Sequence, residues 1–197
     1  GDLTLPSSSL HPVAVISLPK TSLLTGVSSP SFGYSSTGVG DFNGDGHEDI
    51  AFGIPFARGV AEKSGAVIIL WRNEENWEST TSLLPSSLAS LPNSSLGLIL
   101  YCDQLGQFCG VLVKGGCDLN NDGLDDLIIS SQAATVESSA LFVVFGRNHS
   151  AWLRTSGFAS IMSLVSSSST GFKVIPGSSS FGWSVVFGTA AVSCVRV

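Results

Sequence analysis

The stretch "DFNGDGHEDIAFGIP", residues 41–55, gathers carboxylates in a chain that has few of them. Only 15 of the 197 residues are Asp or Glu. Four of these acids occur within nine positions: Asp41, Asp45, Glu48 and Asp49. Carboxylates this close repel one another unless a cation lies between them, and the stretch contains no Lys or Arg. The stretch therefore predicts a bound metal ion.

The same pattern recurs later in the chain. "GDFNGDGHEDIAF" (40–52) aligns with "CDLNNDGLDDLII" (117–129) at an offset of 77 residues. "SGAVIILWR" (64–72) aligns with "SALFVVFGR" (139–147) at an offset of 75. A third start, "SFGWSVV" (180–186), lacks the acidic loop. These matches indicate an internal repeat with a period near 75 residues.

Each repeat is predicted to form four short strands, because apolar segments alternate with glycines and with Ser, Asn and Asp clusters. The predicted strands lie near 32–38, 49–53, 65–71 and 96–101, and near 109–115, 126–130, 139–145 and 171–175. One four-stranded antiparallel sheet per repeat is typical of a β-propeller blade. The predicted fold class is therefore all-β, built of propeller-type blades. Two blades are too few to close a propeller alone, since closed propellers have four to eight.

Both acidic loops, 41–49 and 118–126, have the pattern D-x-N-x-D-G-x-x-D. Side-chain oxygens at positions 1, 3, 5 and 9 and a carbonyl at position 7 form the oxygen shell that Ca²⁺ prefers. The predicted ligands are Asp41, Asn43, Asp45, His47 (through its carbonyl) and Asp49, and Asp118, Asn120, Asp122, Leu124 (through its carbonyl) and Asp126. Glu48 and Asp125 are expected to add negative charge without ligating. The sequence thus predicts two Ca²⁺ sites.

Two other interpretations of the loops fit the sequence less well. An EF-hand would need a bidentate Glu at position 12, where this chain has Phe52 and Ile129. Alternatively, Asp-Gly only forms a hairpin turn between strands. Two copies in phase with the strand repeat favour the metal site over the bare turn.

The first repeat resembles the FG-GAP repeat, which is found in the β-propeller of integrin α subunits and in many surface proteins. Phe32-Gly33 corresponds to the FG, and Gly53-Ile54-Pro55 corresponds to the GAP. The second repeat keeps the loop but has Cys109-Gly110 and Ser130-Ser131-Gln132 at these places. The resemblance covers roughly residues 22–187 and implies calcium-binding propeller blades with a role in adhesion.

The repeat suggests four segments. Residues 1–24 form an N-terminal segment with a candidate edge or donor strand, 25–103 the first blade, 104–177 the second blade, and 178–197 a truncated or remodelled start of a third repeat. An open pair of blades exposes apolar faces and strand edges. The expected partners are therefore copies of the chain, assembled into a ring or filament, or further blades of a longer chain. A protein or glycan ligand remains an open alternative.

Composition excludes several function classes. The net charge is −6, and the nine basic residues are scattered, so nucleic acid is not an expected partner. No apolar run approaches the roughly 18 residues of a membrane-spanning helix. No nucleophile with a matching base is visible, and we expect no enzyme.

Several features favour an extracellular or cell-surface location. Asn93 and Asn148 lie in N-x-[ST] glycosylation sequons. The cysteines, Cys102, Cys109, Cys117 and Cys194, fit no zinc spacing. We expect a disulfide among the first three, with its pairing left open. The chain begins without Met, and we expect that the precursor carried a secretion signal.

The predicted function is a non-catalytic, extracellular, calcium-binding module for adhesion, surface structure or self-assembly. Two alternatives remain. One is an accessory propeller fragment of a larger surface enzyme. The other is a ligand-binding, integrin-like receptor head whose rim loops, 56–63 and 132–138, contact the ligand.

Overall fold

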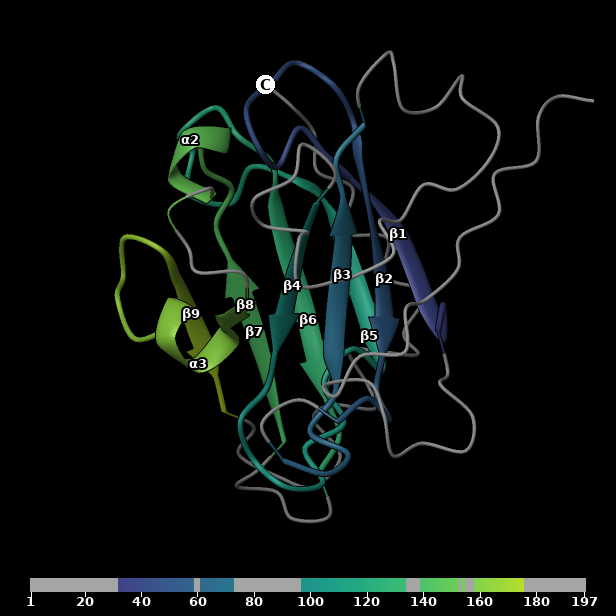
Figure 1. Cartoon of the computed structure of the whole chain (residues 1–197). Helices are drawn as coiled ribbons and strands as arrows, with labels where there is room; N and C mark the ends of the chain where they lie inside the picture. The colour runs from purple at the N-terminus through teal and green to yellow at the C-terminus, as the bar shows by residue number, and fades with distance from the viewer. Residues whose placement is uncertain are drawn as a thin grey trace, which may run out of the picture.

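A computed structural model describes residues 32–58, 61–72, 97–133, 139–152, 154 and 158–175. The predicted N-terminal segment 1–24, the third repeat start 178–197, Asn93 and Cys194 lie outside these residues. The described strands form two sheets that lie one against the other (Figure 1). Among the described residues, no helix is long and apolar enough to cross a membrane.

Sheet 1 has five strands in the order β1-β2-β3-β4-β8. They are β1 (Ser35–Gly40), β2 (Asp49–Ile54), β3 (Ala66–Leu70), β4 (Gly97–Tyr101) and β8 (Phe158–Ser160). Sheet 2 contains β5 (Leu112–Cys117), β6 (Asp126–Ser131), β7 (Ala140–Val144) and β9 (Gly171–Val174), in that order. Two four-residue helices, α2 (His149–Trp152) and α3 (Ile161–Leu164), flank β8 in the sequence.

The eight predicted strands are all present, and the all-β, blade-type fold class is confirmed. Their ends differ from the predicted ends by a few residues. Sheet 1 also has a fifth strand, β8, which pairs in parallel with β4. Its three residues are too few to show a periodic pattern, so the sequence did not predict it. The other pairs of these strands are antiparallel.

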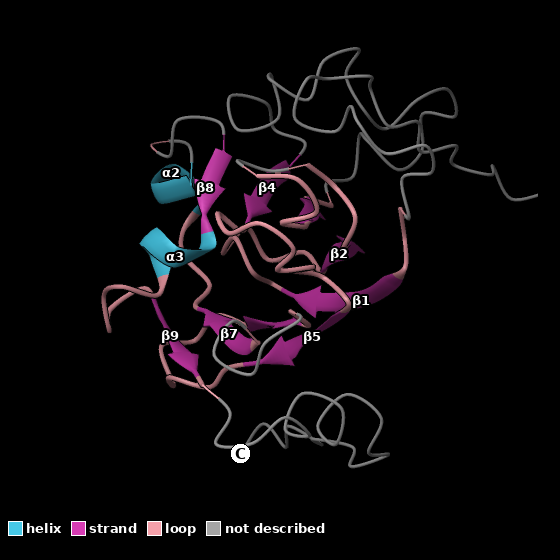
Figure 2. Cartoon of the chain, turned by 90° about the horizontal axis from the view of Figure 1, so that it is seen from below, coloured by secondary structure: helices cyan, strands magenta, loops and turns pink. Residues whose placement is uncertain are grey.

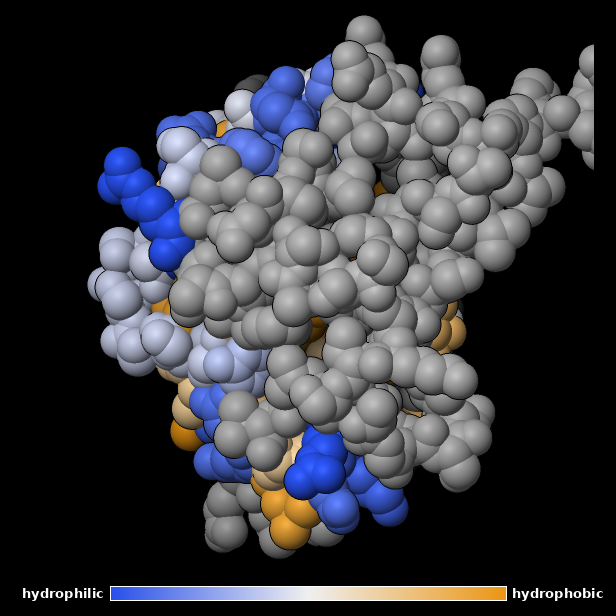
Figure 3. Space-filling model, viewed as in Figure 1, coloured by the Kyte–Doolittle hydropathy of each residue, from blue (hydrophilic) through white to orange (hydrophobic). Residues whose placement is uncertain are grey.

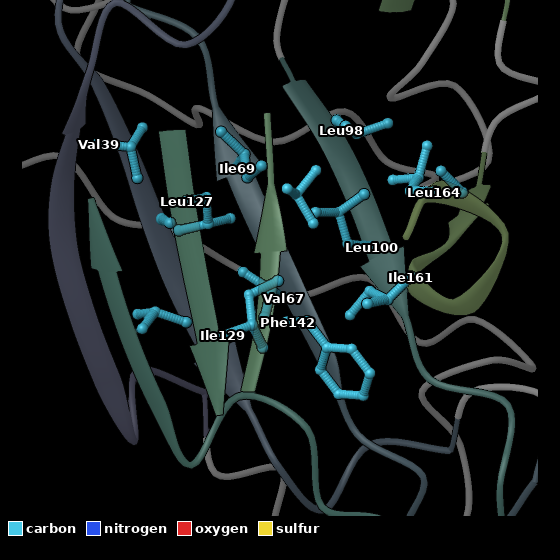
Figure 4. Packing of buried hydrophobic residues seen from close by; sticks show 14 of the residues in the cluster. Val39, Val67, Ile69, Leu98, Leu100, Leu127, Ile129, Phe142, Ile161 and Leu164 are labelled. Carbon is cyan, nitrogen blue, oxygen red and sulfur yellow. The ribbon is translucent and has the colours of Figure 1, made fainter. Parts of the chain in front are cut away.

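The main core lies between the two sheets (Figure 4). Sheet 1 contributes Val39, Val67, Ile69, Leu98 and Leu100, and sheet 2 contributes Val113, Leu127, Ile129, Phe142 and Val144. All are at most 1% exposed. Burying a side chain of this size contributes about 1.5–3 kcal/mol. A second cluster on the other face of sheet 1 contains Ile54, Ala66, Ile68, Leu70 and Ile99. β3 is therefore buried on both faces, which explains its uninterrupted apolar sequence.

The strand register corrects the predicted alignment of β3 with β7. Phe52 pairs with Ile68 in sheet 1, and its counterpart Ile129 pairs with Phe142 in sheet 2. Phe142 thus corresponds to Ile68, at an offset of 74, and not to Val67 at 75. A shift of one residue exchanges the two faces of a strand. Sheet 2 turns the face of Phe142 and Ile129 toward sheet 1. With the corrected offset, the same face of sheet 1 is that of Ile68 and Phe52, which points away from sheet 2. The two sheets therefore face the same way and stack head to tail.

The first strands of the two sheets, β1 and β5, lie side by side (Figure 2). Ser35 Oγ donates to the Gly110 carbonyl oxygen at 2.9 Å. Gly115 lies so close to Val39 that a Cβ added there would be 2.7 Å from the Val39 Cα. Cys102, directly after β4, and Cys109, which precedes β5, form a disulfide. The expected disulfide is confirmed, and its pairing is now assigned.

The approach of β1 to β5 can be tested with two glycines in these strands. Gly115→Ala places a methyl group against the Val39 backbone, and we expect it to lower the free energy of unfolding by about 1–3 kcal/mol. Gly38→Ala is the matched control, because a Cβ at Gly38 has no atom within 4 Å. It should be neutral or stabilise by about 0.4–1 kcal/mol. Urea unfolding measures both, and equal stabilities would contradict the close packing.

Candidate metal centre

The two predicted calcium loops join equivalent strands. The first loop (41–49) connects β1 to β2, and the second loop (118–126) connects β5 to β6. Because β1 and β5 are adjacent, both loops lie at the same end of the sheets, the upper end in Figure 1. Each set of predicted ligands belongs to one loop and the first residue of the strand that follows it.

The first loop is closed by hydrogen bonds to its own carboxylates and amide. The Asp45 amide donates to Asp41 Oδ1 at 3.0 Å and to Asn43 Oδ1 at 2.9 Å. The Gly46 amide donates to Asp41 Oδ2 at 3.0 Å. The His47 amide donates to Asp45 Oδ1 at 2.9 Å, and Asn43 Nδ2 donates to Asp45 Oδ2 at 2.9 Å. The side chains at positions 1, 3 and 5 therefore all turn into the loop.

The second loop repeats this pattern bond for bond. The Asp122 amide donates to Asp118 Oδ1 and to Asn120 Oδ1, both at 3.1 Å. The Gly123 amide donates to Asp118 Oδ2 at 2.8 Å. The Leu124 amide donates to Asp122 Oδ1 at 2.9 Å, and Asn120 Nδ2 donates to Asp122 Oδ2 at 2.8 Å. Gly46 and Gly123 have φ of 87° and 93°, a conformation that glycine adopts without strain.

The aspartate at position 9 anchors each loop to the sheet. Asp49 accepts from the Phe42 amide at 3.2 Å and from the Arg72 amide, just beyond β3, at 3.0 Å. Asp126 accepts from the amide of Leu119 at 2.7 Å and from that of Gly146, beyond β7, at 2.9 Å. Both aspartates are fully buried. They thus connect the start of each loop with the segment that follows the third strand of its sheet, β3 or β7.

Burial makes these two carboxylates difficult to ionise. Burial, helped by the charges of Asp45 and Asp41, raises the pKa of Asp49 to about 8, although the two backbone hydrogen bonds to Asp49 act to lower it. The pKa of Asp126 is also raised, mainly by burial. A cation beside either group would offset this cost.

The donor chemistry of the loops fits Ca²⁺, which takes carboxylate, amide and carbonyl oxygens. Among the described residues, however, no group of three or more His, Cys, Asp or Glu side chains converges as a metal cluster does. In both loops the carboxylates accept hydrogen bonds from the loop amides. A metal site at these loops is thus supported by the donor set, by its repetition and by the buried carboxylate at position 9.

Phe42, at position 2 of the first loop, makes a contact that the sequence did not predict. Its ring is fully buried and stacks with Trp152 at 5.2 Å and with Trp71 at 6.3 Å between centroids. Its carbonyl oxygen accepts from the Arg147 amide at 3.0 Å. The first loop is thereby held by the second repeat. Leu119, its counterpart in the second loop, is 43% exposed.

Asp125 also has a larger role than the sequence predicted. The sequence pattern assigned it only an added negative charge, like its counterpart Glu48. Asp125 is 1% exposed, and its Oδ2 accepts from the Asp41 amide at 3.0 Å. Its own amide donates to the Asp41 carbonyl oxygen at 3.2 Å. The two loops are therefore bonded to each other, and no motif in either loop signals this.

The opposite end of the sheets carries an aromatic cavity of about 310 Å³. Its lining includes Tyr34, Phe56 and Phe108, and Phe56 contacts both other rings edge to face. Figure 3 shows hydrophobic surface at this lower end, where β2 and β4 finish in Figure 1. The rim loops predicted to contact a ligand are only partly described, but Phe56 and Gln132 from them line the cavity.

The insertion of Phe42 into the second repeat can be tested by truncation. Phe42→Ala leaves a cavity between Trp71 and Trp152, and we expect it to cost about 3–5 kcal/mol of unfolding free energy and to change tryptophan fluorescence. Leu119→Ala, at the equivalent exposed position, should change stability by less than about 0.5 kcal/mol. Denaturant unfolding of both variants provides the comparison. Similar losses of unfolding free energy would contradict the conclusion that only Phe42 is packed into a neighbouring repeat.

Comparisons with known proteins agree with the loops and the sheets. The model of the FG-GAP repeat family matches residues 32–70. Integrin alpha-5 of Xenopus laevis is 35% identical over 100 residues, which cover 51% of this chain and 8% of that protein. Integrin alpha-E of Mus musculus is 32% identical over 114 residues, which cover 56% of this chain and 9% of that protein. The chain thus spans less than a tenth of these relatives. Residues 32–70 thus match an FG-GAP repeat, and about half of the chain is similar to integrin α subunits.

Proposed function

We propose that this chain is a non-catalytic, extracellular FG-GAP module that binds two Ca²⁺ ions and serves adhesion or surface assembly. The observation that carries the proposal is the repetition of one loop conformation, with the same five internal hydrogen bonds, around the same oxygen donors. Two separate segments retain this arrangement. A turn without a ligand would not need to retain the acids.

The ions would be held by the position 1, 3, 5 and 9 side chains and the position 7 carbonyl of each loop. These ligands are Asp41, Asn43, Asp45, His47 and Asp49 in the first loop, and Asp118, Asn120, Asp122, Leu124 and Asp126 in the second. Bound Ca²⁺ supplies positive charge and cross-links the loop. Each loop carries four acids and no Lys or Arg, and its position 9 carboxylate is buried, so a cation removes an electrostatic cost.

The adhesive, extracellular role is supported by similarity to integrin α subunits. Exposure of Asn148 is compatible with the proposed glycosylation of its sequon. The non-catalytic role is supported by the sequence, in which we find no nucleophile paired with a base. An accessory propeller of a surface enzyme is the rival interpretation, and residues beyond this sequence would decide it.

A second proposal concerns partners: further blades or other copies of the chain cover the outer face of sheet 2. Leu141, Val143 and Phe172 lie on this face, and Phe172 is 43% exposed. This face corresponds to the inner face of sheet 1, which sheet 2 covers. Head-to-tail stacking can therefore continue with the same type of contact, as in rings or filaments.

Calcium binding predicts a stability difference that depends on the loop acids. At ten times its Kd, Ca²⁺ adds about 1.4 kcal/mol per site, and each kcal/mol raises the Tm by about 2–4 °C. We expect the wild-type chain to melt higher in Ca²⁺ than in chelator. Asp45→Ala combined with Asp122→Ala should abolish that difference. Glu48→Ala, at an exposed acid outside the predicted ligand set, should retain it. A wild-type Tm that is the same in Ca²⁺ and in chelator would refute calcium binding.

Assembly predicts a solution mass above that of one 20.4 kDa chain. Light scattering in millimolar Ca²⁺ and then in chelator measures it. Phe172→Glu places a charge on the outer face of sheet 2, and we expect it to lower the mass because desolvating a charge is costly. Leu105→Glu, at a 72% exposed residue outside the sheets, is the control. A monomer under both conditions would exclude self-assembly and leave further blades of a longer chain as the partner.

A further inference from the structure

We propose that Asp125 is a positioning residue that couples the two calcium loops, so that Ca²⁺ in either loop raises the affinity of the other. This inference rests on the proposed calcium binding. It goes further by making the two sites one cooperative unit and by assigning the linkage to one side chain.

Asp125 and Asp41 are joined by two reciprocal hydrogen bonds. Asp125 Oδ2 accepts from the Asp41 amide at 3.0 Å, and the Asp125 amide donates to the Asp41 carbonyl oxygen at 3.2 Å. Both backbone polar groups of Asp41 are thus held by one residue of the other loop. Asp41 is position 1 of the first loop, so its carboxylate is placed by the backbone that Asp125 holds.

Within its own loop, Asp125 lies between two proposed calcium ligands. It lies between Leu124, whose carbonyl is a proposed ligand, and Asp126, the buried anchor at position 9. An ion that orders these two neighbours also orders Asp125. Order in the second loop is therefore transmitted to position 1 of the first loop without any other element moving.

The hydrogen-bonded bridge between Asp125 and Asp41 is tightly packed. Asp125 is 1% exposed, and an added Cβ at Gly40 would be 2.0 Å from its Oδ2. Gly146 packs just as closely, because a Cβ there would be 2.4 Å from the Asp125 carbonyl oxygen and 3.1 Å from that of Phe42. A buried hydrogen bond to a charged group is stronger than an exposed one and tolerates little displacement. The bridge therefore acts as a rigid link.

The repeat itself supplies the contrast. Glu48, at position 8 of the first loop, is exposed, whereas Asp125 at position 8 of the second loop is buried. The two acids differ by one methylene and have the same charge. Removing either one lowers the negative charge of its loop by one unit, but only the removal of Asp125 breaks the hydrogen bond from the Asp41 amide. Glu48 is therefore a matched control.

Coupling of this kind is reciprocal by thermodynamic necessity and is typically about 5- to 150-fold in affinity. The test measures Ca²⁺ binding by calorimetry in chains with one loop disabled. Disabling the second loop by Asp122→Ala should weaken binding at the first by at least about 5-fold relative to the intact chain. Disabling the first by Asp45→Ala should weaken binding at the second by the same factor.

The same calorimetric measurements, with the intact loops and with either loop disabled, are then repeated in chains that also carry Asp125→Ala, Asp125→Asn or Glu48→Ala. We expect the coupling to disappear in Asp125→Ala, to persist in Asp125→Asn, which keeps an acceptor oxygen, and to persist in Glu48→Ala. Folding in chelator, followed by tryptophan fluorescence, checks each variant. If Asp125→Ala does not fold, the two single-loop variants still test the coupling in chains that retain Asp125.

The outcomes separate this inference from the proposal on which it rests. If calorimetry detects no heat of Ca²⁺ binding to the wild-type chain, calcium binding and the coupling are both refuted. Two sites whose affinities are unchanged when the other loop is disabled would refute the coupling alone. Coupling that survives Asp125→Ala would overturn the assignment to Asp125.

Discussion

The contact of one apolar sheet face with the next is the constraint on which the rest of this structure depends. Sheet 1 is apolar on both faces, so a single blade cannot bury its own strands. Leu127, Ile129 and Phe142 of sheet 2 cover one face and are fully buried there. Because equivalent faces point the same way, the contact is directional and can be repeated. This is the physical basis of a propeller and of the assembly that we propose.

The loops depend on this packing. Phe42 reaches into the second repeat, where Trp152 stacks on it, and the Arg147 amide bonds its carbonyl oxygen. Once the backbone at 41 and 42 is held, the Asp41 carboxylate can accept the amides that close the first loop. The second loop has the same internal bonds, but Leu119 is exposed where Phe42 is buried. The two repeats thus share their internal structure and differ in the contacts that they make with a neighbouring repeat.

The electrostatics of the loops favour a cation for a reason that is independent of family resemblance. Each position 9 carboxylate is buried to anchor its loop, and this burial disfavours its charged form. A neighbouring positive ion would compensate for that cost and for the repulsion among the other acids. The same buried carboxylate thus anchors the loop and would favour the proposed ion beside it. The hydrogen bond between Asp125 and Asp41 joins the two loops, and through it we propose that an ion in one loop favours an ion in the other.

The sequence by itself determined the repeat, the eight main strands, the fold class and the positions of the loop acids. These features are local: β-strand segments and Asp-Gly turns are encoded by nearby residues, and their repetition strengthens the signal. Only the tertiary structure decided the rest. It corrected the offset of β3 and β7 by one residue, paired Cys102 with Cys109, added β8 to sheet 1 and buried Asp125 against Asp41. The β8 pairing and the Asp125 contact join residues that are distant in sequence, the offset depends on the strand register, and the disulfide was one of several pairings that the sequence allowed. Glu48 and Asp125 are chemically almost alike. Their different surroundings arise because Asp125 faces the loop of the preceding repeat, whereas no repeat precedes Glu48 within the described part of the chain.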